Sequence, residues 1–253
     1  MKKTFLFAIL PLIVVFSITG CGEKVNPSQR DVNNSLNINS PSDPSSASYT
    51  SQVFYSFSQG TDGVYPHAGV ILDNNGNFYG TTYNGGAYGF GTVFKIAPNG
   101  QETILRSFLG GSTDGANPYA GLVLDSGGDL YGTTYGGGTY GFGTVFKIAP
   151  NGQEAILHSF SGGSTDGAYP YAGLVLDSGG NLYGTTYDGG TYGFGTVFKT
   201  AANGQETVLH SFTGTPDGAN SYAGLILDTN GNLYGTTYDG GTYGFGTVFK
   251  LSN

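Results

Sequence analysis

The sequence predicts an all-β fold in which one unit of about 50 residues is repeated four times. The phrase GTVFK begins at Gly91, Gly143, Gly195 and Gly246, so the spacings are 52, 52 and 51 residues. A fixed period of this length is typical of repeat architectures. The 46 glycines supply turns, and 19 tyrosines and 17 phenylalanines supply the apolar surface that disordered chains lack. From residue 51 onward we therefore expect a folded, β-rich array.

Each unit contains four short runs of β-favouring residues. In the third copy these runs are residues 172–177 (AGLVLD), 181–187 (NLYGTTY), 195–200 (GTVFKT) and 206–212 (ETVLHSF). The linkers DSGGN and AANGQ contain the glycine and asparagine that tight hairpin turns require. Four antiparallel strands in a unit of this length predict the blade of a β-propeller.

The two ends of the array complement one another. Residues 51–57 (SQVFYSF) copy the fourth strand alone, and the sequence ends just after a copy of the third strand. Pairing of these two pieces would complete the last blade and remove an exposed sheet edge. We therefore predict that residues 51–253 form a β-propeller of four blades with four antiparallel strands each, closed by the N-terminal strand, as a monomeric head.

Residues 1–20 are typical of an export signal, because Lys2 and Lys3 precede the apolar run FLFAILPLIVVF. The tetrapeptide ITGC that ends at Cys21 resembles the bacterial lipobox. This resemblance implies that Cys21, the only cysteine, carries a lipid that anchors the protein to a bacterial membrane, facing the periplasm or the cell exterior. The alternative is a simple secretory signal followed by an incidental cysteine.

Residues 21–50 are rich in Ser, Asn and Pro and show no periodicity, so we interpret them as a disordered tether. Removal of a signal that contains Lys2 and Lys3 changes the formal net charge from −8 to about −10. Such an acidic head is repelled by nucleic acid and by anionic membrane surfaces. The composition therefore predicts no nucleic-acid partner.

The unit SF-x-G-x-x-x-DGA-x-x-YAGL-x-LD-x-x-GNLYGTT-x-x-GG-x-x-x-GTVFK resembles the GloVer-type tandem repeat of choice-of-anchor bacterial surface proteins over residues 51–253. The resemblance implies export and anchoring, and no known catalytic activity. Unlike members with a C-terminal sorting segment, the sequence ends three residues after the last GTVFK. The segment YAGLVLDSGGNLYGTTY is also similar to NHL-type propeller blades, which supports the fold and transfers no site residues.

The longer loops of the four units converge on one rim if the first strand of each unit is innermost. Four copies of these loops, rich in tyrosine and aspartate, would then form four similar shallow sites. Tyrosine rings beside short polar groups suit the apolar faces and hydroxyls of sugars. The candidate ligand-binding residues are Tyr88, Tyr140, Tyr192, Tyr243, Asp62, Asp114, Asp166 and Asp217.

Each candidate set has a structural alternative. The tyrosines could instead fill the space between blades, as could the neighbouring Phe90, Phe142, Phe194 and Phe245, because glycine permits close packing there. The candidate aspartates could brace their loops, since Asp-Gly is a common turn pair. A second aspartate set is expected to form the D-x-x-G-N turns rather than to bind ligand. That set is Asp73, Asp125, Asp177 and Asp228.

The sequence predicts no cofactor and no metal site. The partial glycine fingerprint GTYGFG is not followed by the helix that a dinucleotide site needs. His158 and His210 stand where Arg106 and Tyr55 stand in other copies, so we interpret this position as an exposed site on the outer strand. Metal ligands must lie within bonding distance of one ion, and separate blades are not expected to provide this.

Near-identical copies favour binding over catalysis. Catalysis usually needs dissimilar groups with divergent pKa values in one pocket, whereas several weak, identical sites gain avidity for a repetitive polymer. The predicted function is a non-catalytic, multivalent binding module for a carbohydrate or a cell-surface polymer such as a cell-wall glycan. The alternatives are a structural or adhesive surface protein without a discrete ligand, and a propeller hydrolase or lyase.

Overall fold

A computed structural model describes residues 50–58 and 60–253. The predictions of a signal peptide, of a lipid on Cys21 and of a tether up to residue 49 lie outside the described residues. Ser51–Asn253 forms one unit by its internal contacts. Within the described residues, the structure has no helix of the length and hydrophobicity that crossing a bilayer requires.

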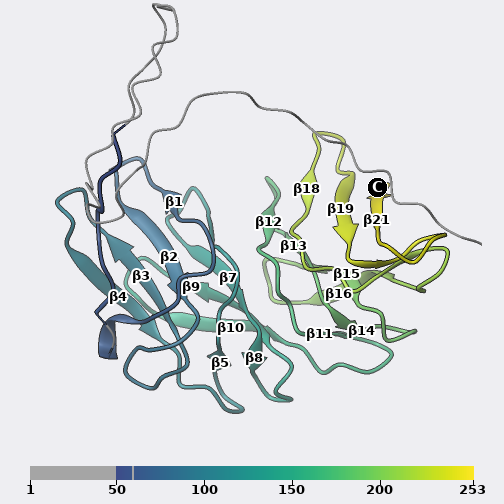
Figure 1. Ribbon diagram of the computed structural model, residues 1–253, viewed down its shortest axis with the longest axis horizontal. Helices are drawn as coiled ribbons and strands as arrows, with labels where there is room; N and C mark the ends of the chain where they lie inside the picture. The colour runs from purple at the N-terminus through teal and green to yellow at the C-terminus, as the bar shows by residue number, and fades with distance from the viewer. Residues whose placement is uncertain (1–49, 59) are drawn as a thin grey trace, which may run out of the picture. The chain divides into compact units, whose positions relative to one another are not determined.

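Four antiparallel sheets, called blades 1 to 4, follow one another along the chain, as the repeat predicts (Figure 1). Blade 1 contains β1 (Ile71–Leu72), β2 (Phe78–Thr82), β3 (Thr92–Ile96) and β4 (Glu102–Ser107). Blade 2 contains β6 (Val123–Leu124), β7 (Leu130–Thr134), β9 (Thr144–Ile148) and β10 (Glu154–Ser159). Blade 3 contains β12 (Val175–Leu176), β13 (Leu182–Thr185), β15 (Thr196–Thr200) and β16 (Glu206–Ser211). Blade 4 contains β18 (Ile226–Leu227), β19 (Leu233–Thr237) and β21 (Thr247–Leu251).

Short two-stranded ladders join the two long loops of a unit. They pair β5 (Gly115–Ala116) with β8 (Gly136–Gly137), β11 (Gly167–Ala168) with β14 (Asp188–Gly189), and β17 (Gly218–Ala219) with β20 (Asp239–Gly240). In the first unit, the short 3-10 helix η1 (Gly60–Asp62) precedes a single bridge between Val64 and Asn84. The predicted convergence of the long loops is thus confirmed, and Figure 1 shows β5, β8, β11 and β14 at the edge opposite to β1, β12 and β18.

The core lies between neighbouring blades and is built on close contacts of glycine with phenylalanine. In blade 3, Gly184 pairs with Phe198, and a Cβ on this glycine would lie 2.7 Å from the Phe198 ring. Only glycine permits this approach. The Phe198 ring in turn meets Phe160 of blade 2 edge to face, with ring centres 5.0 Å apart, and both side chains are fully buried. Equivalent pairs join the other blades, namely Phe108 with Phe146 and Phe212 with Phe249.

Main-chain hydrogen bonds repeat at the three junctions between blades. The N–H groups of Asn117, Tyr169 and Asn220 donate to the carbonyls of Phe90, Phe142 and Phe194 at 2.7–2.8 Å. The donor residues share a left-handed backbone, with φ of 57°, 57° and 55°. The junctions therefore keep one backbone geometry while the side chain of the donor changes.

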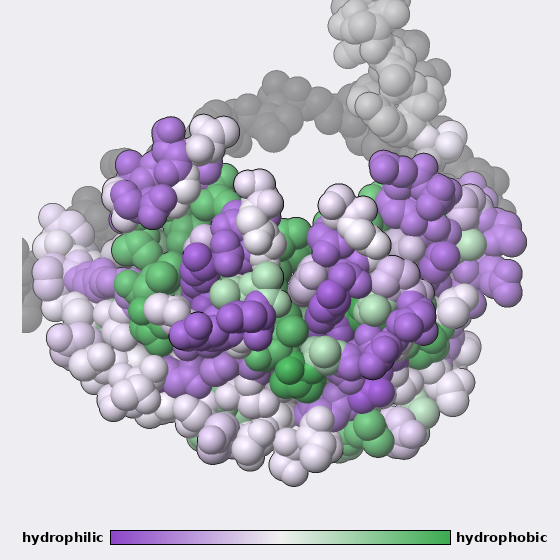
Figure 2. Space-filling view, turned by 180° about the vertical axis from the view of Figure 1, so that it is seen from behind, coloured by the Kyte–Doolittle hydropathy of each residue, from purple (hydrophilic) through white to green (hydrophobic). Residues whose placement is uncertain are grey.

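The strands β1, β6, β12 and β18 all line one open pocket, called the channel, which confirms that the first strand of each unit is innermost. The channel has a volume of about 730 Å³, and its lining includes Leu72, Leu124, Leu176 and Leu227. Figure 2 shows a hollow in the middle of the molecule with hydrophobic residues at its base and hydrophilic residues along its walls.

The predicted closure of the ring by the N-terminal strand is not seen in the structure. Residues 51–57 form no strand, and β21 is the edge of a three-stranded sheet. Residues 51–57 pack on blade 1, where the Phe57 and Phe94 ring centres lie 5.1 Å apart, but they form no ladder with β21. Val248 of blade 4 is 84% exposed, whereas the equivalent Val197 of blade 3 is fully buried. The outward face of blade 4 is therefore bare.

Candidate functional site

The tyrosines predicted to bind ligand lie at the tips of equivalent loops. These tips share one face, called the loop rim, with the β5–β8, β11–β14 and β17–β20 ladders. Tyr88, Tyr140 and Tyr192 are 55%, 59% and 58% exposed, and Tyr243 is 86% exposed. The alternative in which these rings fill the space between blades is therefore wrong. Ligand binding by the four tyrosines stays a prediction.

The neighbouring phenylalanines contact the following blade. Phe142 is half-buried and meets Tyr169 edge to face, with ring centres 5.5 Å apart. Phe90 packs beside Gly110, where an added Cβ would lie 3.0 Å from its ring. Phe245, which has no following blade, is exposed. Phe90, Phe142 and Phe194 thus contact the following unit as predicted, but Phe90 and Phe194 stay 41% exposed, and an interblade role is not observed for Phe245.

The aspartates of the variable-length loops brace those loops. Asp114 accepts hydrogen bonds from the N–H groups of Leu109 and Gly115, both at 2.7 Å. Backbone N–H groups also donate to the equivalent Asp62, Asp166 and Asp217. Asp114 and Asp166 are buried as well. The loop-bracing alternative is confirmed, and ligand contact by these carboxylates stays a prediction that burial disfavours at Asp114 and Asp166.

A belt of aromatic rings was not predicted from the sequence; its members precede the first strand or follow the second strand of each unit. It consists of His67, Tyr83, Tyr119, Tyr135, Tyr171, Tyr187, Tyr222 and Tyr238. The rings touch across blades: His67 stacks on Tyr119 at 4.6 Å, and Tyr171 meets Tyr222 at 4.9 Å. A hydrogen bond with Tyr222 raises the pKa of Tyr187 to about 12. Two recurring tyrosine positions in the sequence could have indicated the belt: one precedes AGL and the other follows GTT.

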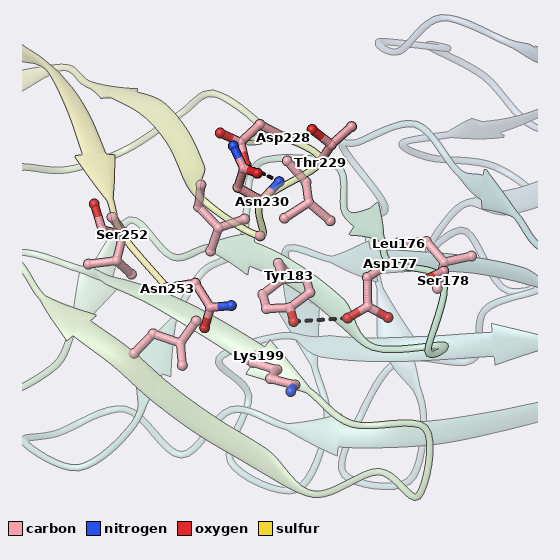
Figure 3. A pocket seen from close by; sticks show the side chains of 15 residues that line it. Leu176, Asp177, Ser178, Tyr183, Lys199, Asp228, Thr229, Asn230, Ser252 and Asn253 are labelled. Carbon is pink, nitrogen blue, oxygen red and sulfur yellow. Dashed lines mark hydrogen bonds between the residues drawn. The ribbon is translucent and has the colours of Figure 1, made fainter.

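The opposite face, called the turn rim, carries a recurring Asp–Tyr–Lys group. Asp177 accepts two backbone N–H bonds of its own turn at 2.8 Å, which confirms its predicted role. It also accepts a hydrogen bond from the Tyr183 hydroxyl at 3.0 Å, and burial together with this bond raises the pKa of Tyr183 (Figure 3). The Lys199 ammonium lies 5.7 Å from the centre of the Tyr183 ring. Asp73, Asp125 and Asp228 form the same turns.

These groups line grooves between neighbouring blades on the turn rim. The groove between blades 3 and 4 has a volume of about 740 Å³ and is lined by the Asp177–Tyr183–Lys199 group (Figure 3). An equivalent groove of about 580 Å³ lies between blades 1 and 2. A carboxylate, a phenol and an ammonium at each groove can hold a polar, uncharged ligand by hydrogen bonds.

The position shared by Tyr55, Arg106, His158 and His210 was predicted to be exposed and on the outer strand. Arg106, His158 and His210 do lie on the outer strands β4, β10 and β16, but all four residues are half-buried. Each side chain instead contacts the aspartate of the following loop: the His158 Nε2 lies 3.1 Å from Asp166, and the His210 Nε2 lies 2.8 Å from Asp217. The physical reason is a β-bulge between Ile156 and His158, which turns the later part of β10 toward the next blade. Side chains of neighbouring units therefore come within hydrogen-bond distance of one another at this position.

The profile of the Gloeobacter/Verrucomicrobia repeat matches the chain twice, over residues 42–180 and 114–253. Similar solved structures include a putative gluconolactonase, with 19% identity and a TM-score of 0.43. A streptogramin B lyase is similar with 14% identity and a TM-score of 0.45. PorZ, a bacterial surface component of the type-IX secretion system of Porphyromonas gingivalis, is similar with 16% identity and a TM-score of 0.47. Each alignment covers 73–74% of this chain. It covers 64% of the putative gluconolactonase, 54% of the streptogramin B lyase and 24% of PorZ, so this chain spans less than two thirds of each of these proteins. A comparison with curated proteins finds no match.

Proposed function

The chain belongs to the Gloeobacter/Verrucomicrobia repeat family, and from this premise we propose that it is an exported, non-catalytic binding module. Its ligand is a carbohydrate or another cell-surface polymer that presents the same group many times. The observation that supports this proposal is the set of four equivalent, exposed tyrosines on the loop rim.

The tips of the loops leave room for a ligand to approach each tyrosine. The glycine that follows each ring, at Gly89, Gly141, Gly193 and Gly244, has open space where a side chain would stand. A sugar ring can therefore stack its apolar face on the tyrosine, while its hydroxyls bond to the phenol and to the backbone of the loop. Nothing in this arrangement requires a cofactor.

Repeated weak sites can together bind a repetitive polymer with high affinity. A single exposed ring contributes little affinity on its own, but sites held on one body raise the effective concentration of a polymer's next repeat. The near-identity of the copies favours this use, since catalysis would need dissimilar groups in one pocket. The exposed belt residues Tyr222 and Tyr238 would extend the aromatic surface toward the channel.

We also propose that Cys21 carries a lipid that holds the protein on a bacterial membrane, facing the periplasm or the cell exterior. The support is the tetrapeptide ITGC after an apolar run. The acidic balance of the remaining chain would keep the head away from anionic lipid.

Closure of the ring at four blades is a further part of the proposal. Residues 51–57 lie on blade 1 as β4 lies on blade 2: the Tyr55 hydroxyl bonds to Asp62 and Glu102, as Arg106 bonds to Asp114 and Glu154. The segment thus occupies the place of an outer strand from a preceding blade. The bare face of blade 4 carries Val248 and Phe245, the residue types that cover the next blade elsewhere.

The full-length protein should be tested on a glycan array and against intact cell-wall polysaccharide. Replacing Tyr88, Tyr140, Tyr192 and Tyr243 together by alanine should abolish binding, and any single replacement should weaken it partly, because the other sites keep their avidity. The matched control replaces the same four residues by phenylalanine, which keeps stacking and should keep most of the affinity.

Because the four rings are more than half exposed, the fourfold alanine variant should fold with an unchanged melting temperature. A folded fourfold variant that binds like the parent would defeat the proposal. A parent protein that binds no polymer would favour the structural or adhesive alternative, and release of new chain ends from a bound polymer would favour the hydrolase or lyase alternative.

A further inference from the structure

A cluster of one bridging side chain and two acids recurs beside the outer strands, and the place of each cluster is called a cleft. At three positions a side chain of residues 51–57, β4 or β10 lies beside the aspartate of the following loop and the first glutamate of the next outer strand. At the first two clefts the pairs of acids are Asp62 with Glu102 and Asp114 with Glu154. At the cleft between blades 2 and 3 they are Asp166 and Glu206. Two carboxylates brought together need a donor or a cation between them.

At the cleft between blades 1 and 2, a cation supplied by the chain meets this need. The Arg106 guanidinium lies 2.5 Å from Asp114 and 2.7 Å from Glu154. A guanidinium is always charged and has several donors, so it can bridge both acids. At this cleft the two carboxylates are therefore neutralised by a side chain of the protein itself, without a bound ion.

At the cleft between blades 2 and 3, His158 replaces the arginine and leaves one acid without a partner. The His158 ring bonds to Asp166 and to neither oxygen of Glu206. Among the described residues, the Oε1 atoms of Glu102, Glu154 and Glu206 are all buried without a hydrogen bond, but Glu102 and Glu154 each have a partner for the other oxygen, which Glu206 lacks.

A second buried polar group distinguishes the same cleft. Thr200 is the cross-strand partner of Glu206, where the other clefts have Ile96 and Ile148 opposite their glutamates. Directly paired residues on antiparallel strands share one face of the sheet. Thr200 is fully buried, and its hydroxyl has no hydrogen-bond partner among the residues that the structure describes. Unpaired buried hydroxyls are rare, because each costs free energy.

We propose that His158, Asp166 and Glu206 form a site for a divalent transition-metal ion such as Zn²⁺. One ligand atom from each residue lies within 4.8 Å of the others, across the junction of two blades. The ion would stand where the Arg106 guanidinium stands at the previous junction. It would join β10 of blade 2 to the loop and outer strand of blade 3.

The geometry needs only a small adjustment of the longest side chain. Two atoms bound to one zinc ion at ~2.1 Å lie about 3.4 Å apart in a tetrahedral site and at most ~4.2 Å apart in any geometry. The Nε2 of His158 is already 3.1 and 3.3 Å from the two Asp166 oxygens. To reach the tetrahedral separation, the Glu206 oxygen would therefore move by at most about 1.4 Å (4.8 − 3.4), which a rotamer change of a long side chain allows.

The ligand types select the class of metal. An imidazole suits Zn²⁺, Cu²⁺ and Ni²⁺, whereas Mg²⁺ and Ca²⁺ prefer oxygen ligands alone. The N–H groups of Ser161 and Gly167 donate to Asp166 at 2.7 and 2.6 Å. Such outer bonds fix the orientation of a ligating carboxylate. A three-residue set also leaves a coordination position for water.

The test uses the full-length protein, freed of metal with EDTA and titrated with Zn²⁺ by calorimetry and with Co²⁺ by visible absorption. The parent should bind one equivalent of Zn²⁺. The Glu206→Gln variant should bind this Zn²⁺ at least about 10-fold more weakly. The sharper variant is His158→Arg, which copies the Arg106 cleft and should fold while losing the site. His210→Gln is the matched control, because His210 has Asp217 beside it but no nearby glutamate. This variant should still bind one equivalent of Zn²⁺.

Zn²⁺ should also raise the melting temperature of the parent and of His210→Gln, but not that of His158→Arg, because a ligand stabilises only the state that binds it. Equal Zn²⁺ binding by the parent and by His158→Arg would overturn the proposal. So would a parent that binds no equivalent and whose melting temperature depends on pH alone, since Glu206 would then be neutralised by a proton.

Discussion

Ring closure can be tested by measuring how much Val248, in the last blade, contributes to the free energy of unfolding. Val197 and Val248 occupy the same position in the phrase GTVFK, but Val197 is fully buried and Val248 is 84% exposed. A Val→Ala change removes two methylene equivalents, about 1.6 kcal/mol by transfer. The cavity left in a packed site raises the cost to roughly 2–3 kcal/mol. Val197→Ala should therefore lower the free energy of unfolding by that amount.

If the ring closes as proposed, Val248→Ala should cost about as much as Val197→Ala, roughly 2–3 kcal/mol, because the N-terminal segment and blade 1 would cover it. Urea unfolding of the parent and both variants, each at two protein concentrations, gives the comparison. A cost below about 0.5 kcal/mol for Val248→Ala, typical of surface positions, would refute closure. A cost that appears only at the higher concentration would show that a second copy covers the face.

Two other changes probe the N-terminus and the acid pairs. Cys21→Ser should release the protein from the membrane fraction or block its processing, as read by fractionation and immunoblotting; a processed, membrane-bound variant would contradict the lipid anchor. Burial and the Asp114 charge raise the pKa of Glu154 from 4.5 to about 7 against the opposing Arg106, so the folded state binds the proton more tightly than the unfolded state. The parent's stability should therefore fall as pH rises from about 4.5 to 7, and Glu154→Gln should lessen this fall in urea titrations; an identical slope in both proteins would contradict the assignment.

Strands whose patterns are set by local turns were predictable from the sequence. The third strand was expected at residues 195–200 and is observed as β15 (Thr196–Thr200). The turn aspartates were predicted as well, because an Asp that opens a D-x-x-G-N turn bonds to its own backbone. The first strand, expected at residues 172–177, is reduced to Val175–Leu176, since only two of its residues pair with β13.

Features that depend on contacts between blades were not predictable. The β-bulge before His158 turns that side chain to the opposite face of its strand, so simple alternation along the strand gave the wrong surroundings. The aromatic belt was missed because its members, such as His67 and Tyr119, come from different units and meet only when the blades surround the channel. The bare face of blade 4 depends on where residues 51–57 pack, which a repeat count does not specify.

The junctions between blades also bear on how such a protein changes over generations. Because main-chain atoms join Asn117 to Phe90 and Tyr169 to Phe142, an in-frame duplication or loss of one 52-residue unit recreates a junction with the same bonds. Replication slippage in the gene can then alter the number of blades in whole steps without new compensating substitutions. Between such events, the cleft residue of a single unit can diverge by one codon, from arginine to histidine, while the blades around it stay the same.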